Sequence, residues 1–168
     1  RDARITAIYE GTNGIQANDL AGRKIAYDRG AAVEALIGLI RQSQLEFEDH
    51  PIQTVNDLSQ QLASSVDVLE KTSSWIVDTF GDAPEQVAAG AVPFLRLMGL
   101  VCGGWLMVRS AATAETMIDS GDGNPDFLRM KITSTRFFAD QLLVQCASLG
   151  QTVVSGGTTI GEVSETDF

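Results

Sequence analysis

The amino-acid sequence predicts an all-α fold, an up-and-down bundle of about four long helices with a flexible C-terminal tail. Apolar residues recur at three- and four-residue steps over long segments, which places them on one face of a helix. No alternating apolar pattern is long enough for a strand, and short clusters of turn residues separate the helical segments. Hydrophobic residues make up 44% of the 168 residues, which is enough for a buried core.

Two helices are predicted before residue 50. A short helix is expected over residues 18–27, and Arg29 and Gly30 end it. The second helix is expected over residues 31–48, before Pro51. Its predicted apolar face consists of Val33, Leu36, Ile37, Ile40 and Phe47.

The third helix is predicted over residues 52–80, with Thr54 as its candidate N-cap. Its predicted apolar face consists of Val55, Leu58, Leu62, Leu69, Ile76 and Phe80. Gly81 is expected to end this helix, and Asp82 is the predicted N-cap of the next one.

The fourth helix is predicted over residues 84–118, with a kink or a restart at Pro93. Three of the glycines in its interior lie within residues 99–104, and each costs about 1 kcal/mol relative to alanine. Close contact with a neighbouring helix is the expected compensation, and contact with a ligand is the alternative. The three glycines are Gly99, Gly103 and Gly104.

A turn cluster over residues 119–125 precedes the last helix, which is predicted over residues 125–153. Its predicted apolar face consists of Phe127, Met130, Phe137, Phe138, Leu142 and Leu149. We therefore divide the chain into a motif-bearing segment over 1–30, a helical domain over 31–154 and a flexible tail over 155–168.

The net charge of the chain is −10. Nucleic acids and anionic membranes bind clustered Lys and Arg, so neither is expected as a partner. The longest apolar stretch, residues 92–108, contains Arg96 and several glycines, and it is short for a membrane span. We therefore predict a buried helix there.

Two cysteines, Cys102 and Cys146, lie inside apolar helical patterns without partners at the spacing of metal ligands. Buried free thiols in a reducing compartment are expected, and with them a cytoplasmic location and no metal site. We interpret His50, which precedes a proline, as a turn residue because no cluster of metal ligands accompanies it.

The most informative segment is residues 1–16, RDARITAIYEGTNGIQ. The carboxylate of Glu10 lies between an aromatic residue and Gly-Thr-Asn-Gly, where small residues let another molecule approach the backbone. A carboxylate needs a perturbed environment to act as a base, and an ordinary surface glutamate is the alternative interpretation. Its apolar neighbours in the sequence are Ile5, Ile8, Tyr9 and Ile15.

This segment resembles the C-terminal motif of the acyl-CoA dehydrogenases, flavoenzymes that carry the sequence Tyr-Glu-Gly-Thr. The matching strings are RDARI at 1–5 and IYEGT at 8–12, and the helical remainder agrees with the all-helical C-terminal domain of that family. The strings PFLRL at 93–97 and GGWL at 103–106 look like its long bacterial members, which include the 3-methylmercaptopropionyl-CoA dehydrogenases.

The resemblance implies that Glu10 is a catalytic base, which removes the α-proton of an acyl-CoA thioester while the β-hydrogen leaves as hydride to FAD. It also implies that the backbone N–H of Glu10 donates to the thioester carbonyl and that Gly11 lets the substrate pass close to the chain. Hydrogen bonding to the carbonyl stabilises the negative charge that develops there.

The resemblance further implies that Thr12, Asn13 and Gly14 contact FAD. Related short-chain enzymes often have glutamine at the position of Gly14, so any side-chain contact made there is missing in this chain. Gln16 is the other polar candidate for a cofactor contact in this segment.

In that family, FAD and acyl-CoA lie between the C-terminal helical domain and two further domains, one of them built of β-strands. No β-domain is visible in this sequence, so we expect a fragment of a longer protein that is inactive alone. The implied partners are acyl-CoA, electron-transfer flavoprotein or a similar acceptor, and further copies of the chain. The competing interpretation is a non-catalytic helical module for oligomerisation or partner binding.

Overall fold

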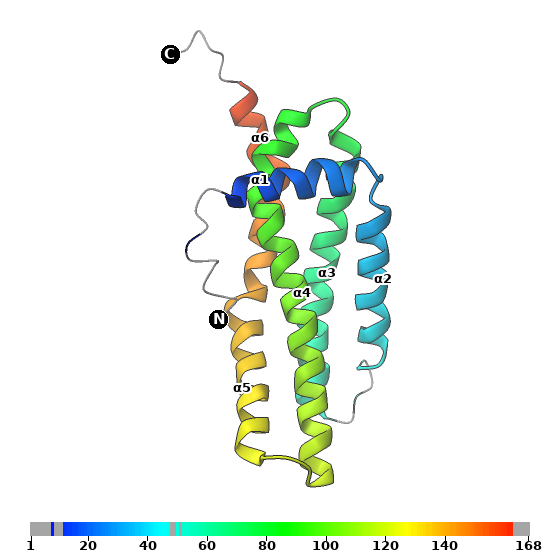
Figure 1. The fold of residues 1–168 in the computed structure, drawn as a ribbon, viewed down its shortest axis with the longest axis vertical. Coiled ribbons are helices and arrows are strands. Elements are labelled where there is room, and N and C mark those ends of the chain that lie inside the picture. The colour runs from blue at the N-terminus through cyan, green and yellow to red at the C-terminus, as the bar shows by residue number, and fades with distance from the viewer. Residues whose placement is uncertain (1–7, 9–11, 48–49, 51, 163–168) are drawn as a thin grey trace.

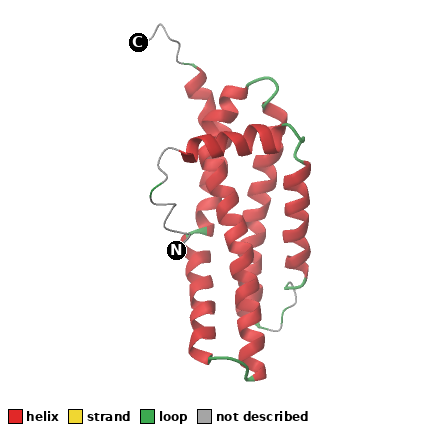
Figure 2. Cartoon of the chain, viewed as in Figure 1, coloured by secondary structure: helices red, strands yellow, loops and turns green. Residues whose placement is uncertain are grey.

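A computed structural model describes residue 8, residues 12–47, residue 50 and residues 52–162. The regular structure of these residues is helical throughout, and none of them lies in a strand (Figures 1 and 2). The predicted all-α bundle is therefore confirmed.

The helices follow the chain in a simple order. They are α1 (Thr12–Asn18), the π-helix η2 (Asp19–Ala26), α2 (Ala31–Leu45), α3 (Gln53–Thr79), α4 (Pro84–Ser120), α5 (Pro125–Gln141), the 3₁₀ turn η3 (Leu143–Gln145) and α6 (Cys146–Gly161). Figure 1 shows α2, α3 and α4 running alternately down, up and down, and α5 with α6 returning upward along α4. Helices α1 and η2 cross the bundle near its upper end.

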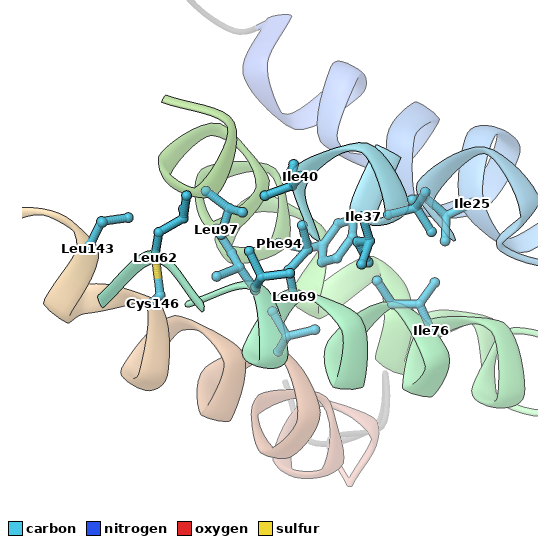
Figure 3. Packing of buried hydrophobic residues seen from close by; sticks show 14 of the residues in the cluster. Ile25, Ile37, Ile40, Leu62, Leu69, Ile76, Phe94, Leu97, Leu143 and Cys146 are labelled. Atoms are coloured by element: carbon cyan, nitrogen blue, oxygen red, sulfur yellow. The ribbon is translucent and has the colours of Figure 1, made fainter. Parts of the chain in front are cut away.

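The long helix α4 lies at the centre and contacts α1, η2, α3, α5, η3 and α6. Its side chains Phe94, Leu97 and Val101 are fully buried. Figure 3 shows side chains of η2, α2, α3, η3 and α6 gathered around Phe94 and Leu97. Among the described residues, α4 is long and apolar enough to cross a membrane, a property that it shares with the core helices of soluble proteins.

Two of the three glycines within residues 99–104 of α4 make the close helix contacts that the sequence predicts. A Cβ atom at Gly103 would lie 3.0 Å from the ring of Phe138, and one at Gly104 would lie 2.8 Å from the side chain of Leu143. The prediction is wrong at Gly99, where a Cβ would meet nothing within 4 Å. Helix α4 continues through Pro93.

The predicted caps of α3 and α4 are wrong. Helix α3 begins after Ile52 without a side-chain cap, and the hydroxyl of Thr54 accepts a hydrogen bond from Arg136 Nη2 at 2.6 Å. Helix α4 follows Ala83 rather than Asp82, again without a side-chain cap. Its first residue is Pro84, which has no N–H that needs a partner.

The turn between α4 and α5 is confirmed. Gly121 adopts a left-handed conformation with φ of 74°, and the N–H of Asp122 donates to Met117 O at 2.8 Å. Asn124 caps α5, because its Oδ1 accepts from the N–H groups of Asp126 and Phe127 at 3.0 and 3.2 Å.

The single last helix predicted over 125–153 is in fact two helices, separated at Leu142 and the turn η3. At the break, Leu143 is buried and its side chain lies against Gly104 of α4. The predicted apolar face is also wrong in part. Phe127, Met130 and Phe137 expose 59%, 62% and 65% of their surface.

The boundaries of three other segments differ from the prediction. Residues 12–26 form α1 and η2 where a short helix was expected over 18–27, and α2 ends at Leu45. Residues 155–161, expected to be part of a flexible tail, are the last turns of α6. They are held in place because α6 lies directly on α4: a Cβ at Gly157 would be 2.7 Å from Gln86 Cα.

We predict that Gly157→Ala destabilises the bundle by about 1–3 kcal/mol, because the atoms that the new methyl group meets are Cα, Cβ and the carbonyl oxygen of Gln86. Urea unfolding would show the loss in the free energy of unfolding, and hydrogen exchange would show the last turns of α6 opening. Gly99→Ala is the matched control, and it should stabilise α4 by up to about 1 kcal/mol. Equal behaviour of the two variants would contradict the close contact.

We also predict that Asn124→Ala lowers the free energy of unfolding by about 1 kcal/mol, because two N–H groups at the start of α5 lose their acceptor. The control is Asp82→Ala, at a position that the sequence marks as a cap but the structure does not. It should change stability by less than about 0.5 kcal/mol. Thermal or urea unfolding of both variants measures the difference.

Candidate functional site

Small and apolar side chains hold α1, which carries the described candidate residues, and η2 on the bundle. Ala17 of α1 and Ala21 and Ile25 of η2 are each at most 2% exposed. These residues recur every four positions, and both α1 and η2 contact α4. The remaining positions of α1 are therefore directed outward or along the surface of the bundle.

The structure places four of the six candidate residues on α1. Thr12 and Gly14 are half-buried, whereas Asn13 and Gln16 are exposed. Glu10 and Gly11, the predicted base and its neighbour, lie outside the described residues.

Three polar side chains of α1 lie close together on one helix. Gln16 follows Asn13 by three residues and Thr12 by four, and residues at these spacings are neighbours on a helix surface. Within the described part of the chain, none of the three has a side-chain hydrogen bond. Their hydroxyl and amide groups are thus available to a polar ligand.

A group of charges directly follows these residues on η2. Asp19 accepts a hydrogen bond from Arg23 Nη2 at 3.0 Å, and Lys24 Nζ lies 3.6 Å from its Oδ2. The hydrogen bond from Arg23 lowers the pKa of Asp19 below its usual value. We did not predict this group, although the spacing of Asp19 and Arg23 is that of a helical ion pair.

The turn after η2 sets the change of chain direction between η2 and α2. Arg29 and Gly30 both have left-handed backbone conformations, with φ of 56° and 84°. Asp28 supports this turn, because its Oδ1 accepts from the N–H of Gly30 at 2.9 Å and its Oδ2 from the N–H of Ala32 at 3.0 Å. The chain therefore reverses sharply, so that η2 crosses the bundle and α2 runs along it (Figure 1).

The other residues whose side chains could take part in catalysis or metal binding are the two cysteines and His50. Burial raises the pKa of the thiols of Cys102 and Cys146, which keeps both thiols protonated and poorly nucleophilic. His50 Nδ1 accepts from the N–H of Ile52 at 3.2 Å, in agreement with its interpretation as a turn residue. Among the described residues, no group of three His, Cys, Asp or Glu side chains could hold a metal ion.

Three hollows of 220–270 Å³ lie away from the candidate segment. One lies between the start of α2 and α3, a second between the end of α2 and α3, and a third between α3 and the region where α5 gives way to α6. None of the three is lined by Thr12, Asn13, Gly14 or Gln16. The described polar residues of α1 therefore lie on an open surface rather than in one of these hollows.

Comparison with known proteins identifies relatives over nearly the whole chain. A family model described as acetyl-CoA dehydrogenase C-terminal like matches residues 32–164. The chain is 35% identical to 3-methylmercaptopropionyl-CoA dehydrogenase of Ruegeria pomeroyi over 95% of its own length and 27% of that protein. It is 28% identical to the broad-specificity linear acyl-CoA dehydrogenase FadE5 of Mycobacterium tuberculosis over its full length and 28% of that protein.

The chain thus spans about a quarter of the length of the curated relatives that it matches. The family model covers α2 to α6, and the candidate residues precede it. The helical fold, the match to the family model and the two relatives agree with the resemblance carried by residues 1–16. The chain belongs to the acyl-CoA dehydrogenase family, of which it represents the helical C-terminal region.

Proposed function

We propose that this chain is the C-terminal part of a FAD-dependent acyl-CoA dehydrogenase and that Glu10 is the base of the reaction. The proposal rests on one observation, the sequence Tyr-Glu-Gly-Thr immediately before and into α1. In a chain that belongs to this family, we interpret the single carboxylate in that sequence as the group that accepts the proton. The helix α1, which begins at Thr12, contacts α4, and its residue Ala17 is fully buried.

The proposed role of Glu10 is to accept the α-proton of an acyl-CoA thioester. A carbon acid next to a thioester is weakly acidic, so the carbonyl oxygen must be stabilised as the proton leaves. The backbone N–H of Glu10 donates a hydrogen bond to that oxygen in our proposal. Gly11 has no side chain, so the thioester can lie close to the backbone.

Thr12, Asn13 and Gln16 are the residues that would hold FAD. Their side chains offer hydroxyl and amide groups, and Asn13 and Gln16 are exposed. Gly14 is half-buried and offers backbone groups alone. Bound FAD would supply the acceptor for the β-hydrogen, which leaves as hydride.

The substrate class is an acyl-CoA thioester, and the identity with the Ruegeria pomeroyi enzyme makes 3-methylmercaptopropionyl-CoA the first compound to test. We further propose an electron-transfer flavoprotein or a similar protein as electron acceptor, a homo-oligomeric assembly and a cytoplasmic location. The relatives are about three and a half times as long as this chain, so the rest of the site would come from other parts of a longer polypeptide.

The alternative is that the chain serves as a non-catalytic helical module for oligomerisation or partner binding. The family model matches only α2 to α6, and the three hollows described above are not lined by the described candidate residues Thr12, Asn13, Gly14 and Gln16. These observations are equally consistent with a scaffold, so the two functions differ only in what Glu10 does.

We predict that Glu10→Gln, introduced into the longer polypeptide that contains this chain, slows reduction of bound FAD by acyl-CoA by a factor of about 10²–10⁴. Loss of a positioned general base has an effect of this size. The measurement is the bleaching of flavin absorbance after mixing with substrate under anaerobic conditions. FAD content should be unchanged, because glutamine keeps the shape of the side chain.

Glu34→Gln, at an exposed position on α2, is the matched control and should bleach at the rate of the parent protein. If Glu10→Gln also bleached at the parent rate, Glu10 would not be the base, and the scaffold function would be favoured.

We also predict that the purified chain of 168 residues contains no stoichiometric FAD, because it would supply only part of the flavin site. Absorbance near the flavin band, compared with protein concentration, measures the bound fraction. The longer polypeptide is the positive control. A yellow preparation of the short chain with one FAD per molecule would show that the chain binds the cofactor by itself.

A further inference from the structure

One aromatic side chain at the end of α3 contacts the π-helix η2 and the residue that follows it. The ring of Phe80 lies against Gly22, because a Cβ atom at Gly22 would be 3.2 Å from its Cε2 and 3.4 Å from its Cζ. The centroid of the same ring lies 6.2 Å from that of the Tyr27 ring, and the two planes form an angle of 57°. Phe80 is partly buried and also packs against the core, so it links η2 to α3.

The two contacts of Phe80 depend on the π-helical form of η2. Gly22 and Tyr27 are five residues apart, and the N–H of Tyr27 donates to Gly22 O at 3.1 Å. A hydrogen bond over five residues is that of a π-helix. In an α-helix, residues at this spacing differ in direction by about 140°. The wider turn of the π-helix brings Gly22 and Tyr27 closer to one face, where a single ring can contact both.

A neighbouring side chain on α3 supports the turn that follows η2. Gly30 has a left-handed conformation with φ of 84°, and a Cβ atom there would be 3.4 Å from Val77 Cγ2. Val77 and Phe80 are three residues apart, so they are neighbours on the surface of the helix end. The end of α3 therefore fits against both η2 and the turn after it.

The contact at Phe80 bears on the candidate residues because α1 and η2 form one continuous helical segment. Asn18, where the two meet, has helical backbone angles, with φ of −66° and ψ of −38°. A change in the direction of η2 therefore changes the direction of α1 as well. Thr12 precedes Gly22 by ten positions, or about 15 Å of helix, so a rotation of about 5° at η2 would move the start of α1 by about 1 Å.

The contact with α4 restricts such a rotation only weakly. The fully buried side chains of α1 and η2 are Ala17, Ala21 and Ile25, and two of the three are single methyl groups. A methyl group reaches only a short way into the grooves of a neighbouring helix, so it fixes the distance to that helix better than the rotation. The ring of Phe80 on Gly22 adds a contact from a second helix, and this contact opposes the rotation.

We propose that Phe80 is a positioning residue, which sets the direction of η2 and α1 through its contacts with Gly22 and Tyr27. The inference rests on the proposed function, because the side chains that it places are those proposed to hold FAD, next to the base Glu10. A displacement of about 1 Å can cost about 10²-fold in rate, so a residue that never touches cofactor or substrate can still affect the site.

Binding of FAD to the longer polypeptide, first freed of FAD, tests the inference. Phe80→Ala should weaken FAD binding at least about tenfold, because the polar side chains of α1 lose their placement. Hydrogen exchange at the amides of residues 12–26 should become faster by about the same factor, because the segment opens more readily. Fluorescence titration and mass spectrometry measure the two effects. If Phe80→Ala does not fold, Phe80→Leu, which keeps a smaller contact, replaces it.

Phe138→Ala is the matched control. The ring of Phe138 also lies against a helix glycine, since a Cβ atom at Gly103 would be 3.0 Å from its Cζ, and it is also partly buried. It belongs to α5, which lies at the other end of α4 from η2 (Figure 1). Loss of this ring should lower stability but leave FAD affinity and exchange at residues 12–26 unchanged. Equal effects of the two variants would show that Phe80 has only a structural role and would overturn the inference.

Gly22→Ala tests the contact from its other side. The new methyl group would press on the Phe80 ring, so FAD binding should weaken at least about threefold. In the Phe80→Ala background the ring is absent, and the same change should have no effect. Gly99→Ala, where a Cβ atom meets nothing within 4 Å, should leave FAD affinity unchanged in both backgrounds. Additive effects of Gly22→Ala and Phe80→Ala would contradict the proposed contact.

Neither FAD affinity nor hydrogen exchange involves proton transfer to Glu10, so the two proposals can be separated. If Glu10→Gln bleached at the parent rate while Phe80→Ala weakened FAD binding, the proposed base would be wrong and the positioning role would stand. Loss of bleaching in Glu10→Gln, together with parent FAD affinity in Phe80→Ala, would overturn the positioning role alone.

Discussion

Glycine on both sides of the contact between α4 and α6 lets these two helices approach each other with little side-chain volume between them. Gly90 lies against Val153, and Gly157 lies against Gln86. Each glycine weakens its helix by about 1 kcal/mol, so this part of the fold depends on the packing that the glycines permit. With one side of α4 occupied by α6, the remaining sides receive α3, α5 and the α1–η2 segment. The position of the candidate site is therefore a consequence of how α4 is packed.

The long helices could be predicted because their ends carry strong local signals. Residues 52–80 and 84–118 were expected to be helical, and α3 and α4 occupy 53–79 and 84–120. Gly81 and Pro84 mark one boundary and Gly121 the next. The break at Leu142 could not be predicted, because no glycine or proline lies there. The neighbouring Leu143 packs against Gly104, which is distant in sequence. The sequence pattern likewise does not separate Phe138, which packs partly buried against the core, from Phe137, which is exposed.

The family could be recognised from the first sixteen residues because the motif is long and specific. The structure adds the setting of that motif: α1 rests on α4, its polar residues face outward, and the described hollows lie elsewhere. The sequence contains no comparable signal for η2. Ala17, Ala21 and Ile25 are four residues apart, and in an α-helix such residues drift by about 40° at each step. The wider hydrogen-bonding ring of a π-helix reduces that drift and keeps all three against the bundle.

This π-helix lets the segment hold more residues per turn than an α-helix would. Removing one residue between Asp19 and Ala26 would bring the segment closer to an ordinary helical repeat, with a similar total rotation from one end to the other. Asn13 and Gln16 would then keep about the same direction relative to the bundle. Across homologous chains, loss of one residue should accordingly be accepted more readily in this stretch than inside α3 or α4.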